Sequence, residues 1–239
     1  MYLPLLDRLL YRRPFEGGSA RRYADDERPA FGDLDDRLLD RLAPQLTAPA
    51  GPPAAALVGA SAGPPASALV GPSAGPLVGA SGRRLLDLGC GPATFARRAA
   101  ERFPGLTVVA VEPSHDFARP GIVRAVGEAL PLADRSIDVA ICLSSIRHVR
   151  DRAATLRELR RVVRGLLVIV ELDPDADARR VATHAHRLAS PVVRRLFAPL
   201  VLRTAPPSHV IAALAREAGF TVRELRADPI QPVYVMDLV

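Results

Sequence analysis

The stretch from Leu85 to Ala96, Leu-Leu-Asp-Leu-Gly-Cys-Gly-Pro-Ala-Thr-Phe-Ala, most constrains what this chain can fold into. A short apolar run reaches an acid, turns through two glycines and enters a helical pattern. This order predicts a strand, a tight turn and a helix N-terminus. In open α/β folds, ligands bind outside the carboxyl ends of the strands, beside such a turn. We therefore expect a ligand site at Gly89 and Gly91.

The chain after Arg83 alternates between strand and helix patterns. Apolar and β-branched runs predict strands at 84–88, 107–112, 122–125, 137–143 and 166–172, and two further runs predict a hairpin over 220–226 and 232–238. Helical patterns cover 93–102, 152–163, 176–202 and 208–218. Alternating β/α units closed by a hairpin indicate an α/β fold, a Rossmann-like doubly wound sheet that is mostly parallel with an antiparallel C-terminal hairpin strand.

Three parts of the chain differ in character. Residues 1–46 predict helices over 2–11 and 33–46, which we expect to form a cap on the substrate side. The first helix is amphipathic; docking on its own domain is the favoured interpretation, and contact with a membrane surface is the alternative. Residues 47–82 carry no charge and are rich in Pro, Ala and Gly, which predicts a linker. Residues 83–239 form the predicted catalytic domain.

Composition limits the classes of binding partner and the cellular compartment that we expect for this protein. The 32 basic residues, all arginine, give a net charge of +6, which would suit nucleic acid, anionic lipid or an acidic metabolite. The arginines alternate with acids on most predicted helices, so solvated faces are favoured and nucleic acid is not the expected partner. Cys90 and Cys142 occupy predicted core positions without metal-ligand spacing, which indicates reduced thiols, no metal site and a cytoplasmic protein. Arginines interrupt the N-terminal apolar run, and we expect neither a signal peptide nor a membrane span.

Three acids accompany the glycine turn. Asp87 precedes it, and Glu112 ends the second predicted strand about twenty residues later, the offset at which an acid meets a ribose diol. Glu128 opens the loop Gly-Glu-Ala-Leu-Pro-Leu-Ala-Asp-Arg-Ser-Ile-Asp that leads into the fourth strand. Together with Leu-Asp-Leu-Gly-Cys-Gly and Val-Ala-Val-Glu, this loop makes the chain from Arg83 onward resemble a class I S-adenosylmethionine-dependent methyltransferase of the small-molecule type.

The resemblance implies S-adenosylmethionine as the cofactor and a role for each matching residue. Gly89 and Gly91 would let the backbone approach the cofactor, and Asp87 would lie near its amino-acid end. Glu112 would accept hydrogen bonds from the ribose hydroxyls. The remaining cofactor contacts implied are the Glu128 carboxylate and the Ala129 amide at the adenine, together with Cys90, Pro113 and Leu143.

The chain departs from the family pattern at two places. Pro92-Ala93 replaces the third glycine of the turn, which puts the affinity for the cofactor in doubt but leaves binding expected. Before the fifth strand, the usual Arg-Pro-Gly-Gly turn is shortened to Arg164-Gly165, which we expect to be a short loop on the face away from the cofactor.

Candidate residues for catalysis and acceptor binding follow the fourth and fifth strands. His148 is the candidate general base because imidazole titrates near neutral pH, and a purely structural role is the alternative. Tyr23, Arg147, Glu171 and Asp173 are candidate substrate residues. Residues 174–207 carry a run of arginines that would form either a basic lid over the substrate or an exposed helix face. His184 and His186 fall on different faces of a helix, which argues against a metal pair.

The predicted function is methyl transfer to a small-molecule or glycan acceptor, at oxygen. The block Arg-Arg-Tyr-Ala-Asp-Asp-Glu-Arg-Pro-Ala-Phe over 21–31 resembles the methyltransferases that modify the mycofactocin oligosaccharide. The alternatives are a methyltransferase for a quinone, a lipid-linked acceptor or RNA, and a cofactor-binding protein without transfer activity. The oligomeric state stays open.

Overall fold

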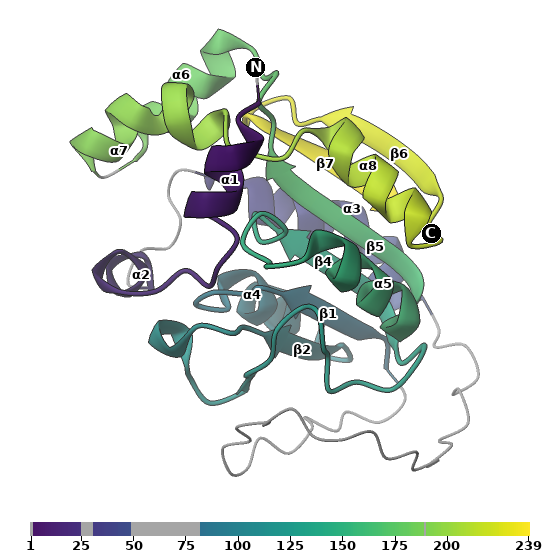
Figure 1. Cartoon of the computed structure of the whole chain (residues 1–239). Coiled ribbons are helices and arrows are strands. Elements are labelled where there is room, and N and C mark those ends of the chain that lie inside the picture. The colour runs from purple at the N-terminus through teal and green to yellow at the C-terminus, as the bar shows by residue number, and fades with distance from the viewer. Residues whose placement is uncertain (1, 25–30, 49–81, 189) are drawn as a thin grey trace.

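The computed structural model describes residues 2–24, 31–48, 82–188 and 190–239, and places seven strands in one sheet with the order β3-β2-β1-β4-β5-β7-β6. Figure 1 shows the sheet running through the centre of the molecule. The strands are β1 (Arg84–Leu88), β2 (Thr107–Val111), β3 (Ile122–Val123), β4 (Ile137–Leu143), β5 (Val163–Leu172), β6 (Val222–Ala227) and β7 (Val233–Leu238).

The sheet is parallel from β3 to β5 and antiparallel at β7. β1 pairs in parallel with β2 on one side and with β4 on the other. β7 runs antiparallel to β5, with Glu171 opposite Tyr234, and β6 runs antiparallel to β7. This topology confirms the predicted Rossmann-like sheet with an antiparallel C-terminal strand.

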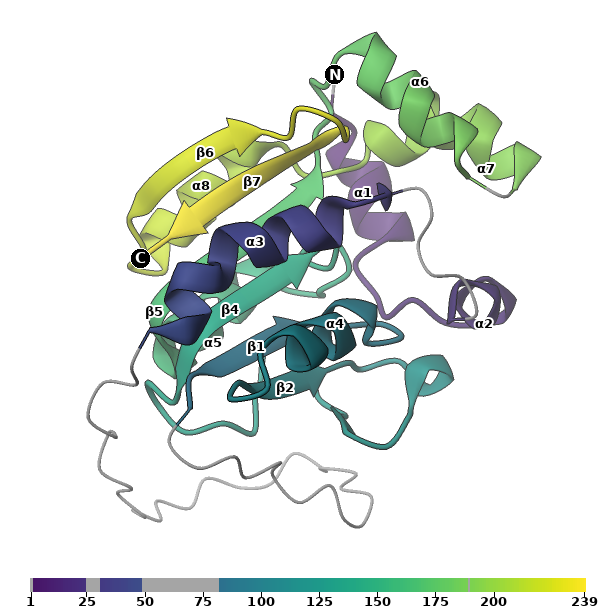
Figure 2. The same ribbon diagram turned by 180° about the vertical axis from the view of Figure 1, so that it is seen from behind.

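Helices cover both faces of the sheet. α5 and α8 lie on the face toward the viewer in Figure 1, and α3 and α4 lie on the opposite face, which Figure 2 brings to the front. The helices are α1 (Pro4–Leu10), α2 (Gly18–Ala24), α3 (Leu34–Thr47), α4 (Thr94–Arg102), the 3₁₀ turn η2 (His115–Phe117), α5 (Arg152–Val162), α6 (Ala178–His186), α7 (Pro191–Leu196), the π-helical turn η3 (Phe197–Leu202) and α8 (Ser208–Glu217). None of the helices in the described ranges has the length and apolar character that a membrane crossing requires.

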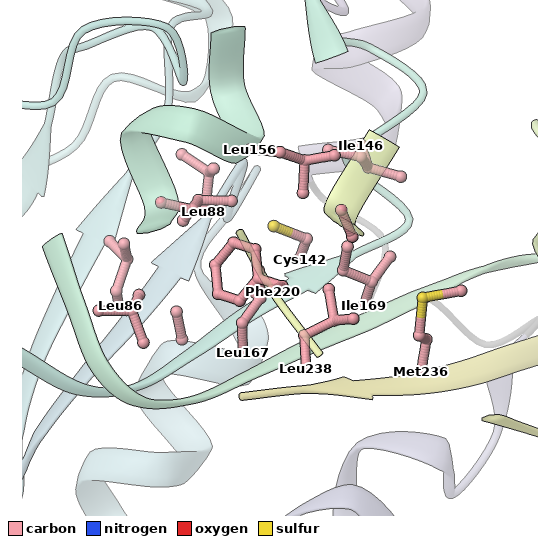
Figure 3. Close-up of a cluster of buried hydrophobic side chains, with 14 of the residues drawn as sticks. Leu86, Leu88, Cys142, Ile146, Leu156, Leu167, Ile169, Phe220, Met236 and Leu238 are labelled. Atoms are coloured by element: carbon pink, nitrogen blue, oxygen red, sulfur yellow. The ribbon is translucent and has the colours of Figure 1, made fainter. Parts of the chain in front are cut away.

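Alternate side chains of the strands fill two separate cores, as the pleat of a strand requires. Leu86, Ala140 and Cys142 point to the α5 and α8 side, where they meet Leu156 and Ile211. Figure 3 shows this cluster packed between the sheet and the helices. The neighbouring residues of the same strands point to the α3 and α4 side.

Helix α3 is part of the second core. Its five buried leucines pack there with the side chains of β1, β4, β5 and β7; they are Leu34, Leu38, Leu39, Leu42 and Leu46. Two arginines on the same helix bind carboxylates at the other end of the chain, Arg37 with Asp228 and Arg41 with Asp237. Of the N-terminal helices, α1 and α2 lie at the carboxyl edge of the sheet, so a cap over the substrate stays a prediction for those two. The predicted linker over 47–82 lies almost wholly outside the described residues.

Two expectations about element boundaries are wrong. Arg164-Gly165 is not a loop, because α5 ends at Val162 and β5 begins at Val163. The Arg164 side chain bonds the buried Asp138 carboxylate at the amino edge of the sheet, and a Cβ on Gly165 would lie 2.3 Å from the Asp138 carbonyl oxygen. The predicted helical stretch over 176–202 is broken, because Ser190 caps a new helix whose first residue is Pro191.

Asp138 joins three strands at this amino edge. Its carboxylate accepts hydrogen bonds from the Arg84 amide and from the side chains of Arg83 and Arg164. Burial would raise the pKa of Asp138, but these donors hold it below its usual value. The start of β1 is thereby tied to β4 and β5.

In the turn after β1, every second residue adopts a left-handed backbone conformation. Gly89 has φ of 70°, Gly91 has φ of 53° and Ala93 has φ of 60°. A left-handed backbone costs a residue with a Cβ roughly 1–2 kcal/mol, whereas glycine adopts it freely. Ala93, which replaces the third glycine, therefore keeps the turn but with a strained backbone.

We expect Ala93→Gly to raise the free energy of unfolding by about 1 kcal/mol, because the substitution removes this strain. Urea unfolding followed by circular dichroism measures the change. The matched control is Ala100→Gly, an exposed position inside α4, which should lower stability by about 1 kcal/mol. Equal losses in both variants would contradict a strained turn.

Candidate functional site

Three acids meet at the carboxyl edge of the sheet. Asp87 in β1, Glu112 after β2 and Glu171 in β5 lie there because these strands are parallel, and Leu143 ends β4 between them. All three carboxylates are buried, Glu112 at 6% and Glu171 at 0% exposure. A buried carboxylate is costly unless hydrogen bonds or opposite charges compensate it, so their partners define the site.

Glu112 is held by two backbone amides. Its Oε2 accepts from Gly91 and its Oε1 from Ser114, both at 2.9 Å. Burial raises the pKa of the carboxyl, against the effect of these amides. A carboxylate offers about four acceptor positions, so the group can still receive donors such as the two hydroxyls of a ribose. The residue therefore fits the diol of a nucleoside.

The two glycines of the turn are needed for different reasons. A Cβ on Gly89 would lie 2.4 Å from the Cβ of Ser145, whose hydroxyl donates to the Leu88 carbonyl at 2.6 Å. Gly89 is therefore required by packing between β1 and the turn after β4. A Cβ on Gly91 would meet only the rings of Tyr23 and Phe117, at 3.9 and 4.0 Å. Gly91 is the glycine that faces the site.

The other residues that the resemblance assigns to the cofactor lie around this turn. Cys90 is buried and free, and burial raises the pKa of its thiol. The Pro113 carbonyl accepts from Arg124 at 3.0 Å. Leu143 is buried in the α3-side core. Their contacts with a cofactor stay predictions.

Glu128 and Ala129 make contacts within the protein. A Glu128 oxygen accepts from the Asp151 amide at 2.8 Å, ahead of α5, and the Ala129 amide donates to the Val126 carbonyl at 3.2 Å. The loop after β3 is thereby tied to the start of α5. The proposed contacts of both groups with an adenine stay predictions.

Aromatic rings from the N-terminal segment cover the glycine turn. Phe15 contacts Tyr23, Phe117 and His148, with ring centroids 5.9, 6.2 and 6.0 Å apart, and Tyr11 contacts His148 at 5.8 Å. Tyr23, the predicted substrate residue, also packs edge-on to Phe117. We call these five residues the aromatic cluster.

Two carboxylates hold this segment in place. Asp116 in η2 accepts from the Gly17 amide at 2.6 Å and from Arg21 at 2.9 Å. Asp7 in α1 forms a bidentate ion pair with Arg152 at the start of α5, with both distances 2.7 Å, and also accepts from the Tyr2 hydroxyl. Removing one partner of such a buried pair typically costs 3–5 kcal/mol.

Arg147 and Glu171 form a second buried charge pair. The Arg147 guanidinium lies 4.0 Å from a Glu171 oxygen and donates at 3.0 Å to the Val201 carbonyl and the Thr204 hydroxyl. It also lies 3.9 Å from the centre of the Tyr11 ring. Burial raises the pKa of Glu171, against the charge of Arg147. The structure thus brings two of the predicted substrate residues together.

Three buried polar atoms at the ends of β4 and β5 have no hydrogen-bond partner among the described residues: Ser144 Oγ, Arg147 Nε and Glu171 Oε2. Ser144 follows β4 in a left-handed conformation with φ of 53°. Unsatisfied buried polar atoms and strained backbone are both uncommon in folded proteins and concentrate at functional sites. Their coincidence at the ends of β4 and β5 supports the prediction that the acceptor binds there.

The remaining candidates lie farther out. Asp173 lies in the turn after β5, where its carboxylate accepts a hydrogen bond from the Asp175 amide. Arg180, in the predicted basic lid, forms an ion pair with Asp177 and donates to the Asp228 carbonyl. His184 bonds Gln231 at 2.9 Å and stacks on Phe197, a structural arrangement. Among the described residues, no three His, Cys, Asp or Glu side chains gather where they could hold a metal ion.

His148 lies inside the aromatic cluster. Burial lowers its pKa to about 3, the charge of Arg147 adds to this effect, and hydrogen bonds to the Arg13 and Tyr11 backbone oppose it. The imidazole is therefore neutral at physiological pH, with one ring nitrogen able to accept a proton. Its role as a base stays a prediction.

The fold and the arrangement of this edge agree with the predicted resemblance to class I S-adenosylmethionine-dependent methyltransferases. Residues 86–169 match the family profile described as "Methyltransferase domain". This match supports the predicted similarity to methyltransferases and S-adenosylmethionine as the cofactor.

Known proteins show the same likeness. An uncharacterized 37.1 kDa protein in a transposon of Streptomyces fradiae is 32% identical over 155 residues, covering 59% of this chain and 44% of that protein. The demethylmenaquinone methyltransferase of Roseiflexus castenholzii is 28% identical over 161 residues, covering 58% of this chain and 68% of the relative. The crystal structure of a SAM-dependent methyltransferase from Aquifex aeolicus matches with a TM-score of 0.60 at 12% identity, covering 94% and 98% of the two chains, which shows the shared fold.

Several residues of the site escape sequence reasoning. Tyr11, Phe15 and Phe117 carry no motif, and only the four-residue spacing of the first two hints at a common helical face. The Asp7–Arg152 pair joins residues 145 positions apart. Ser144 and Ser145 follow a buried strand directly, and small polar residues at that place are the signal that could have drawn attention to them.

His148 should make the stability of the protein fall in mild acid. Its pKa is about 3 in the folded chain and 6.5 when unperturbed, so below pH 6.5 the unfolded chain binds a proton that the folded chain does not. The contribution is complete above pH 6.5 and is lost as the pH falls, by up to about 1.4 kcal/mol per unit. His148→Phe, which keeps a ring in the cluster, should flatten the decline between pH 6.5 and 4.5.

Urea unfolding at stepped pH, followed by circular dichroism, measures this slope. His186→Gln, an exposed position on α6, is the matched control and should retain the parent slope. If the free energy of unfolding falls equally with pH in His148→Phe and in the parent, the imidazole is not buried in the neutral form.

Proposed function

We propose that this chain transfers a methyl group from S-adenosylmethionine to an oxygen atom of a small-molecule acceptor held at the ends of β4 and β5. The observation that carries the proposal is Glu112, a buried carboxylate fixed by the Gly91 and Ser114 amides with acceptor positions to spare. An acid so placed beside the glycine turn has the chemistry that a ribose diol requires.

Different residues at the glycine turn would bind different parts of the cofactor. Glu112 would hold the ribose hydroxyls, and Asp87 would face the positively charged amino-acid end. Gly91 would admit the cofactor between the turn and the rings of Tyr23 and Phe117. S-adenosylmethionine supplies a methyl group activated by its sulfonium, so the protein contributes proximity, orientation and exclusion of water.

The acceptor side favours a hydroxylated molecule. Glu171 Oε2 can accept from a hydroxyl, whereas Arg147 Nε and Ser144 Oγ can donate to an oxygen. An acceptor that carries a hydroxyl and a neighbouring carbonyl or anionic oxygen would satisfy all three atoms. This complementarity supports transfer to oxygen. His148 is the predicted acceptor of the hydroxyl proton; because burial lowers the pKa of its imidazole to about 3, binding of the acceptor would have to raise that pKa for the transfer to occur.

A quinone acceptor is the second candidate. Its support is the similarity to the demethylmenaquinone methyltransferase of Roseiflexus castenholzii, which extends over 58% of this chain. A hydroquinone would present a phenolic hydroxyl to Glu171 and an apolar ring to the aromatic cluster. A glycan such as the mycofactocin oligosaccharide remains a finer prediction, and residues 25–30 of the block that suggests it lie outside the described residues.

Glu112→Gln should remove the preference of the site for an intact ribose diol. We expect the parent to bind S-adenosylhomocysteine at least tenfold more tightly than its 2′-deoxy analogue, because a hydrogen bond to a charged group is worth about 1.5–3 kcal/mol. The variant should bind the two nearly equally, as measured by calorimetry. A preference that persists unchanged in Glu112→Gln would exclude this residue as the ribose ligand.

Labelled-methyl transfer into a metabolite extract, with mass spectrometry of the product, tests the reaction. We expect an O-methyl product, and at least a tenfold lower kcat/KM for Arg147→Gln with unchanged cofactor affinity. A product methylated at nitrogen or carbon would overturn transfer to oxygen. Cofactor binding without any labelled product would instead identify a binding protein without transfer activity.

A further inference from the structure

Helix α1 turns its apolar side outward. Four of its seven residues are exposed leucines, with Leu5 at 69% and Leu9 at 62%, and Leu6 and Leu10 beside them at about helical spacing. Its buried residue is Asp7, which is held by Arg152. The helix therefore docks on its own domain, as expected, but through an ion pair, and its leucine face stays exposed.

Helix α7 adds a second apolar element at the same end of the molecule. All six of its residues are exposed, including Val192 at 66%, Val193 and Leu196. The two elements are linked, because the Leu3 amide ahead of α1 donates to the Arg203 carbonyl after η3 at 2.9 Å. Figures 1 and 2 both place α1, α6 and α7 beyond the carboxyl edge of the sheet. We call the exposed leucines and valines of α1 and α7 the α1–α7 surface.

Arginine is the main charged residue along the chain of α6 and α7. The sequence contains no acidic residue between Asp177 and Ser208, whereas it has six arginines there, at 179, 180, 187, 194, 195 and 203. Arg194 and Arg195 are exposed within α7, and Arg8 is exposed within α1. Apolar side chains interleaved with arginines are the composition of helices that lie at anionic lipid interfaces.

Other occupants fit less well. In a symmetric dimer the same patch would meet itself, and arginine would face arginine. A nucleic acid would complement the arginines but would leave the leucines in contact with phosphate and sugar. An anionic bilayer satisfies both features, because its headgroups attract the arginines and its acyl region receives the leucines and valines.

We propose that the α1–α7 surface docks on an anionic phospholipid bilayer, with both helices lying in the headgroup region. Because this surface borders the carboxyl edge, docking would turn the acceptor side of the site toward the membrane. An acceptor dissolved in the bilayer would then enter the site without crossing water. That last consequence rests on the proposed function, whereas the docking itself does not.

Vesicle flotation with the full chain tests the docking. We expect binding to vesicles of phosphatidylglycerol and phosphatidylcholine in equal parts, weak binding to phosphatidylcholine alone, and release by salt. The assay needs neither cofactor nor acceptor, so its failure would leave the proposed methyl transfer untouched. Equally strong binding to neutral vesicles, or no binding to either, would overturn the proposal.

Two double variants separate the two contributions. Leu5→Glu with Leu9→Glu should lower the partition constant by about tenfold or more, since interfacial binding scales with the apolar area buried. Arg194→Gln with Arg195→Gln should lower it roughly thirtyfold, from about 1 kcal/mol per arginine near an anionic surface. The matched controls are Leu225→Glu on β6, also exposed, and Arg216→Gln on α8, which should bind as the parent does.

Circular dichroism checks that each variant folds, which the outward direction of these side chains leads us to expect. If the controls lose vesicle binding as fully as the two double variants, the effect is general charge and the surface is not the docking site. If sedimentation shows a dimer that the leucine variants dissociate, the surface is an interface between copies of this chain, and the lipid proposal is wrong.

Discussion

The bidentate ion pair between Asp7 and Arg152 fixes the N-terminal segment to the carboxyl edge of the sheet, and much of the site depends on it. With Asp7 anchored at the start of α5, the chain carries Tyr11 over Arg147 and Phe15 over His148. The same anchor decides which side of α1 faces outward. One buried interaction therefore sets the cover of the cofactor site, the surroundings of the candidate base and the exposure of four leucines.

The buried carboxylates at the two edges of the sheet have different hydrogen-bond partners. At the amino edge, Asp138 is saturated by an amide and two arginines, and its pKa is lowered. At the carboxyl edge, Glu112 and Glu171 have raised pKa values, and Glu171 keeps an oxygen without a partner among the described residues. Left-handed backbone at residues other than glycine occurs at both edges, at Ala93 and Ser144 on the carboxyl side and at Arg135 before β4 on the amino side.

Local patterns predict most of the fold, and long-range contacts explain what they miss. β1 and β4 match their predicted bounds because each is an apolar run between clear turn signals. The break before α7 could have been predicted from Ser190-Pro191, a cap followed by proline at the first helical position. The leucine face of α3 is visible in the sequence, but nothing local says that it packs on the sheet. Glu112 is predicted from its offset, whereas the contacts of His148 with Tyr11 and Phe15 depend on chain segments far apart.

The placement of the tyrosines gives the molecule a built-in optical reporter. The chain has four tyrosines and no tryptophan. Tyr2 bonds Asp7, Tyr11 lies on Arg147, Tyr23 packs on Phe117, and Tyr234 stands opposite Glu171 in the sheet. All four lie toward the carboxyl end of the sheet, so the ultraviolet emission of the protein arises from this end of the molecule. Movement of the N-terminal segment or arrival of a ligand would therefore be visible in unlabelled protein, with no background from the rest of the fold.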